Sequence, residues 1–120
     1  MASDDPFGPS MSDTPCVSVV VPFFDSERHV AACVESLLGQ EHVGGPFEII
    51  LVNNGSSDGS ASVVSRYREV ALLDEPAPGA YAARNTGIGR ARAPIVAFTD
   101  ADCVVDRHWL QSVCPNRRPC

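Results

Sequence analysis

Four short apolar segments divide the chain at regular intervals. Each is rich in β-branched residues and nearly continuous rather than alternating, which is typical of strands buried on both faces, as in a parallel sheet. The segments are residues 17–21, 49–52, 70–73 and 95–98. The apolar pattern therefore predicts four strands of one parallel sheet.

Helical patterns occupy the intervening segments. Apolar residues recur at helical spacing within residues 26–39, 58–68 and 79–92, and a further helix is expected over 107–113. Gly39 is placed to end the first helix, and Ser57 or Asp58 to cap the second. The order of elements predicts an α/β doubly wound sheet, mostly parallel, with right-handed crossovers and helices on both faces.

The two ends of the chain lack this periodicity. We expect a disordered leader over residues 1–15, one folded unit over 16–113 and an irregular tail over 114–120. The leader has neither region of a signal peptide, and no apolar run approaches the roughly 18 residues that span a bilayer. We expect a cytoplasmic protein, with a peripheral position at the inner face of the membrane as the alternative.

Composition excludes several classes of function. The 120 residues carry 9 Lys+Arg against 15 Asp+Glu, a net charge of −6, and every basic residue is arginine. The absence of lysine excludes a P-loop lysine, a Schiff-base lysine and a receiver-type phosphorelay lysine. The acidic balance argues against nucleic acid as the main partner, because nucleic-acid binding needs a concentrated basic face.

The five cysteines include no C-x-x-C pair. Because their number is odd and a secretion signal is missing, we expect reduced thiols. A zinc site made of Cys103, His108 and Cys114 is the alternative, although this spacing matches no closed structural site well.

Turn-forming polar residues follow each predicted strand. In open α/β sheets, ligands bind beyond the carboxyl ends of the strands, so these loops predict one site at that edge. Asp100 and Asp102 are its sharpest pair, because positions i and i+2 at a strand end point to the same side. Two such carboxylates are suited to bind Mg²⁺ or Mn²⁺ together with the phosphates of a substrate. The alternative is a solvated turn that binds no metal.

The other loops offer groups that could recognise a nucleotide. The Asn54 amide could accept from a uracil-type imide, and Gly55 lets a base approach closely. Phe24 offers a stacking face, with a core or hinge role as the alternative. The Arg84 guanidinium is suited to donate paired hydrogen bonds to a diphosphate, and the alternative is an ordinary surface charge.

Four motifs, in this order, resemble the family 2 glycosyltransferases of the GT-A fold. The second resembles the family's V-D-D-G-S-x-D-G-T loop and the third its G-x-x-x-A-R-N-x-G element. The motifs are VSVVVPFFD, FEIILVNNGSSDGS, GAYAARNTGIGRA and IVAFTDADCVVDRHWL. The resemblance covers roughly residues 16–113 and implies a Rossmann-like GT-A nucleotide-binding half.

The resemblance also implies an activity and a set of roles. The protein would bind a nucleotide-diphosphate sugar, a UDP-sugar above all, with Mn²⁺ or Mg²⁺. It would transfer the sugar with inversion to a glycan, lipid or small-molecule acceptor. The implied nucleotide-pocket residues are Pro22, Phe24 and Asp25, with Asn54 facing the base, Asp100 near the ribose or metal and Asp102 on the metal.

The sequence departs from the family pattern in three places. Asn53 and Asn54 replace the acidic pair, and Asp25 replaces a common asparagine. The chain also ends soon after Asp102, so we expect a truncated or frame-shifted product of a longer gene, with weak or no transfer. The general base is expected beyond Cys120, because Asp106 begins a helix and is a poor candidate.

Two other functions are alternatives to a sugar transfer. A non-catalytic module that binds a nucleotide sugar would need no general base. A dinucleotide-binding oxidoreductase has only Gly87-Ile88-Gly89 in its support, and that run lies late in a helix without a third glycine at the required spacing.

Overall fold

The computed structural model describes residues 14–41 and 43–113. The expected leader, apart from its last two residues, and the expected tail lie outside this part of the chain. One sheet of four parallel strands forms the centre, in the order β3-β2-β1-β4. Its strands are β1 (Val17–Phe23), β2 (Phe47–Asn53), β3 (Ala71–Asp74) and β4 (Ile95–Phe98). The predicted parallel α/β sheet is confirmed.

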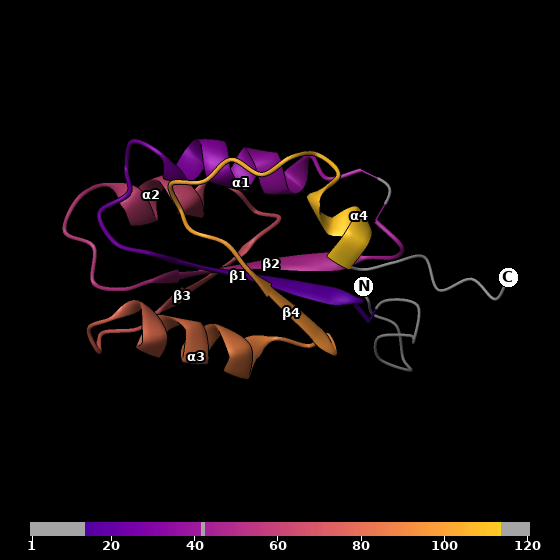
Figure 1. Ribbon diagram of the computed structural model, residues 1–120. Coiled ribbons are helices and arrows are strands. Elements are labelled where there is room, and N and C mark those ends of the chain that lie inside the picture. The colour runs from indigo at the N-terminus through magenta and orange to yellow at the C-terminus, as the bar shows by residue number, and fades with distance from the viewer. Residues whose placement is uncertain (1–13, 42, 114–120) are drawn as a thin grey trace, which may run out of the picture.

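Four helices cover the two faces of the sheet (Figure 1). They are α1 (Val30–Leu38), α2 (Ser60–Ser65), α3 (Ala80–Arg90) and α4 (Trp109–Val113). In Figure 1, α1 and α2 lie above the sheet and α3 lies below it. The helix expected from residue 26 begins only at Val30, because the amides of His29 and Val30 both donate to the carbonyl of Ser26 and form a tight turn first.

The continuous apolar runs arise because both faces of the central strands are covered. Val19, Val21 and Leu51 pack in the larger core beneath α1, α2 and α4. Val20 and Ile50 point to the opposite face and pack with Ala83 of α3. All seven residues of β1 are buried, and complete burial of a Val or Ile side chain contributes about 1.5–3 kcal/mol.

Small residues let α3 approach the sheet closely. A Cβ atom built on Gly87 would lie 2.4 Å from Cγ1 of Val20, a distance that no side chain tolerates without a shift. Gly87, the first glycine of the Gly87-Ile88-Gly89 run, is therefore a packing residue. Within the described residues, no helix is both long and apolar enough to cross a membrane.

A polar cluster holds the amino-terminal end of the sheet. The buried Ser18 hydroxyl donates to Glu48 Oε2 at 2.5 Å, and the amide and Nε of Arg92 donate to the same carboxylate at 2.8 and 3.1 Å. Burial opposes ionisation of Glu48, but these hydrogen bonds outweigh it and lower its pKa. The cluster is far from the strand ends at which the site was predicted.

Cysteine chemistry differs in part from expectation. Cys16 is disulfide-bonded, so the expectation of reduced thiols is wrong at this position, whereas Cys33 and Cys103 are free. Counting and spacing cannot reveal which thiols a fold brings together. Cys114 of the alternative zinc site lies outside the described residues.

Candidate functional site

A cleft of about 460 Å³ opens at the carboxyl ends of the strands. The ends of β1 and β2, the start of α3 and the loop after β4 all contribute to it. Its lining residues are Pro22, Phe23, Phe24, Ser26, Asn54, Pro78, Gly79, Ala80, Asp100, Ala101 and Asp102. The cleft therefore lies at the edge where parallel α/β sheets bind ligands.

The cleft brings together five of the eight residues singled out in the sequence. Pro22 is buried at the end of β1, whereas the side chain of Phe24 is 60% exposed. The other three of the five are Asn54, Asp100 and Asp102. Asp25, Gly55 and Arg84 are not among the lining residues. The sequence predicted that the loop after the third strand, residues 75–79, lies at this edge, but it singled out neither Ser26 nor Ala80.

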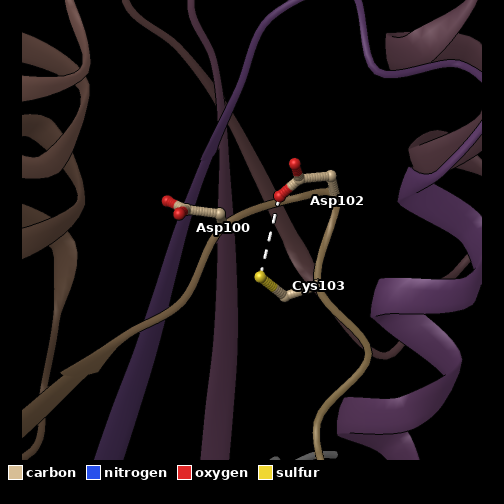
Figure 2. A group of neighbouring side chains, drawn as sticks. All are labelled: Asp100, Asp102 and Cys103. Atoms are coloured by element: carbon tan, nitrogen blue, oxygen red, sulfur yellow. Dashed lines mark hydrogen bonds between the residues drawn. The ribbon is translucent and has the colours of Figure 1, made fainter.

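Asp100 and Asp102 lie together on the loop after β4 (Figure 2). Ligand atoms of these two residues and of Cys103 all lie within 4.8 Å of one another, and all three residues are exposed. The Cys103 thiol donates a long hydrogen bond of 3.6 Å to Asp102 Oδ1. None of the ion pairs formed between described residues includes either aspartate.

These residues fit a hard divalent cation. Two neighbouring carboxylates without a basic partner repel each other, and a cation between them removes that repulsion while offering further positions to phosphate oxygens. Cys103 was predicted only in the alternative zinc site and not beside the two aspartates, although its place directly after D-x-D is a signal for it. Behind the loop, the Cys33 thiol donates to the carbonyl of Asp100 at 3.5 Å. Burial raises the pKa of Cys33 to about 11, so it stays protonated at neutral pH.

Acidic side chains join the two neighbouring loops at residues 24–27 and 56–60. Asp25 has a positive φ of 48°, and its Oδ1 accepts from the amides of Ser57 and Asp58 at 2.8 and 3.3 Å. Glu27 Oε1 accepts from the amide of Gly59 at 3.1 Å. The carboxylate of Asp25 is thus bound to backbone amides and does not line the cleft.

Asp58 extends this network to the start of α2. Its Oδ1 accepts from the amide of Ser60 at 2.9 Å and from the Ser60 hydroxyl, while Oδ2 accepts from the amide of Glu27 at 3.2 Å. The hydrogen bond from the Ser60 hydroxyl is the main cause that lowers the pKa of Asp58. Of the two expected caps, Asp58 therefore contacts the helix start, whereas Ser57 does not.

The Asn54 side chain is bound to the loop between β3 and α3. Its Nδ2 donates to the carbonyls of Glu75 and Ala77 at 2.9 and 2.8 Å, and its Oδ1 accepts from the amide of Gly79 at 3.1 Å. Asn53 instead donates to Asp74 Oδ1 at 3.1 Å and accepts from the amide of Ser56. Asn54 is thus held by the neighbouring loop, and Asn53 by the end of β3 and by its own loop.

Comparisons with known proteins assign this arrangement to a family. The model of glycosyl transferase family 2 matches residues 18–115, which is most of the chain, and the chain belongs to that family. Glycosyltransferase AglE of Haloferax volcanii is 31% identical over 105 residues, covering 83% of this chain and 34% of AglE.

Solved structures agree with the fold. The crystal structure of Staphylococcus aureus TarS 1-349 in complex with UDP matches with a TM-score of 0.74 and 25% identity, covering 81% of this chain and 30% of that one. The mannosyltransferase PcManGT of Pyrobaculum calidifontis, in complex with GDP-Man and Mn²⁺, matches with a TM-score of 0.70 and 26% identity, over 83% and 30%. The fold is the Rossmann-like part of a GT-A fold, and the chain spans about a third of the length of these relatives.

Proposed function

We propose that the cleft binds a nucleotide-diphosphate sugar through a divalent cation held by Asp100 and Asp102. One observation carries the proposal: two exposed carboxylates face the cleft at the strand ends, and no described basic side chain forms an ion pair with them. A diphosphate meets strong repulsion from such carboxylates unless a cation bridges the two. The complex of PcManGT with GDP-Man and Mn²⁺ supports a divalent metal.

The nucleotide is proposed to be UDP. TarS structures contain UDP or UDP-GlcNAc, whereas PcManGT contains GDP-Man, so family membership alone does not select the base. The exposed ring of Phe24 in the cleft is suited to stack on a uracil. The roles expected for Arg84 and Gly55 remain predictions, as does the cytoplasmic location.

The whole protein is proposed to transfer the sugar with inversion. The acceptor hydroxyl oxygen bonds to the anomeric carbon, the bond from that carbon to the diphosphate oxygen breaks, and a carboxylate base takes the hydroxyl proton. A bound cation neutralises the charge of the departing nucleoside diphosphate. We assign the base to no described residue, because Asp106 is outside the cleft and its Oδ2 accepts from the amide of His108 at 2.8 Å.

Calorimetry with UDP, with and without Mn²⁺, tests the binding proposal. We expect the metal to raise the affinity, and Asp102→Asn to weaken the metal-dependent affinity by at least about tenfold, or about 1.4 kcal/mol. Glu69→Gln is the matched control, because Glu69 is exposed and lies outside the cleft in the connection before β3. The control removes a negative charge without touching the site.

Two results would contradict the proposal. One is equal affinity for UDP with and without Mn²⁺ in the wild-type chain. The other is an Asp102→Asn variant that keeps its metal-dependent affinity. Binding of the sugar nucleotide without any transfer in the whole protein would instead support a non-catalytic binding module.

A further inference from the structure

The loop at residues 75–79 forms one wall of the cleft. It connects the edge strand β3 to α3, and Pro78 and Gly79 line the cleft together with Ala80, the first residue of the helix. Gly79 has a φ of +107°, which an L side chain rarely adopts. The position of this wall therefore depends on what holds the loop.

Asn54 holds three backbone groups of that loop at once. Its two amide protons go to the carbonyls of Glu75 and Ala77, and its oxygen accepts from the amide of Gly79. Only a primary amide carries two donors and an acceptor on one planar group. A carboxylate in this place would face the two carbonyl oxygens without a proton, so aspartate cannot replace Asn54 at neutral pH without loss of these bonds.

The rest of the loop is tied down locally. Glu75 Oε2 accepts from the amide of Ala77 at 2.8 Å, and Oε1 accepts from the Thr86 hydroxyl on α3. The amide of Glu75 donates to the carbonyl of Asn53 at 2.8 Å. Asn54 is thus the side chain that fastens the far end of the loop, at Ala77 and Gly79, to the end of β2.

We propose that Asn54 is a positioning residue that fixes the wall at residues 78–80, by donating to the preceding carbonyls and accepting from the Gly79 amide, rather than the residue that reads the nucleobase. The proposal rests on the proposed function only in that the cleft binds a nucleotide. It explains why an asparagine stands where the family motif has an acidic residue. The amide secures the loop and adds no third charge to a cleft that already contains Asp100 and Asp102.

Hydrogen exchange of the Gly79 amide tests the positioning role without a ligand. In Asn54→Ala we expect the protection factor of this amide to fall about tenfold, while amides in the centre of β1 and β2 keep theirs. Asn54→Asp keeps an acceptor for Gly79 but loses both donors to the loop. We therefore expect faster exchange of the Gly79 amide in this variant as well. Unchanged protection of Gly79 in both variants would overturn the proposal.

Nucleotide binding supplies a readout that depends on the donors themselves. Relative to the wild type, Asn54→Asp should bind UDP with Mn²⁺ about tenfold more weakly at pH 7, and the deficit should narrow as the pH is lowered towards the ordinary aspartate pKa of about 3.9. The reason is that a protonated carboxyl regains one donor for the loop. Ser62→Asp, which adds a charge at an exposed position of α2 outside the cleft, should show no such convergence.

The outcomes separate this proposal from the proposed function. If Asn54 reads the base, Asn54→Ala abolishes the preference between UDP and CDP while Gly79 keeps its protection, and the positioning role is wrong. If the wild-type chain binds no nucleotide yet Gly79 loses protection in the variants, the positioning role stands and the proposed function fails.

Discussion

Two groups of carboxylates lie at the same edge of the sheet and are held in opposite ways. Asp25, Glu27 and Asp58 accept hydrogen bonds from backbone amides of the neighbouring loop. Asp100 and Asp102 accept none from an amide within the described part of the chain, and the single bond to their carboxylates comes from the weak Cys103 donor. Near the strand ends, one group of carboxylates is thus bound to backbone amides and the other group is not.

The difference separates carboxylates that build the site from carboxylates that are free to act in it. A carboxylate that accepts amide protons is already stabilised and gains little from a cation. A pair with no amide donor carries an unfavourable repulsion that only an external cation or proton can remove. The D-x-D pair is therefore the part of this edge expected to bind a ligand, and the other three acids position its surroundings.

Removing both open carboxylates should have the largest effect on binding. In the double variant Asp100→Asn/Asp102→Asn we expect metal-dependent UDP affinity to fall by about a hundredfold, or about 2.8 kcal/mol. Its free energy of unfolding should stay the same or rise, because a repulsion is removed. Calorimetry and urea denaturation measure the two quantities. A loss of stability above about 1 kcal/mol would show that these carboxylates hold the fold after all.

Asp25 should behave in the opposite way. Asp25→Ala removes the acceptor of the Ser57 and Asp58 amides and should lower the free energy of unfolding by about 1–2 kcal/mol. Asp25→Asn keeps an acceptor oxygen and should recover at least half of that loss. Urea denaturation decides this, and an alanine variant as stable as the wild type would remove Asp25 from the positioning group.

The sequence predicted the open pair and the contact of Asp58 with the helix start, but not the bonds that Asp25 and Glu27 accept, for a physical reason. Asp100 and Asp102 follow a buried strand at i, i+2 spacing, so local geometry alone brings them together. The sheet was likewise predictable, because β1 and β2 are apolar on both faces. The bonds of Asp25 and Asn54 instead join residues 21 to 33 positions apart, and which backbone groups they meet depends on loop conformation.

Acidification should weaken the contributions of Asp58, which belongs to the positioning group, and of Glu75, which holds the loop at residues 75–79. Hydrogen bonds from Ser60 and Thr86 lower the pKa values of Asp58 and Glu75 below their ordinary 3.8 and 4.5. Such groups stabilise the fold above their ordinary pKa, and this contribution is lost as the pH falls through the lowered values. As the pH is lowered below about 4.5, the urea denaturation midpoint of the wild type should therefore fall, and that of Asp58→Asn should fall less steeply. A Glu69→Gln control should keep the wild-type profile, and an Asp58→Asn profile identical to it would count against this role.

The smallest effect is expected at Cys103, whose thiol belongs to neither group of carboxylates. Its thiol is within 4.8 Å of both open carboxylates, but it donates only one long hydrogen bond and is exposed. Because Mg²⁺ and Mn²⁺ prefer oxygen ligands, Cys103→Ser should change UDP affinity with either metal by less than about twofold and stability by less than about 0.5 kcal/mol. Calorimetry with Mn²⁺ and then with Zn²⁺ sharpens the test, since a thiolate ligand would matter for zinc first. A loss with Mn²⁺ as large as that of Asp102→Asn would place Cys103 among the ligands and extend the open group to three residues.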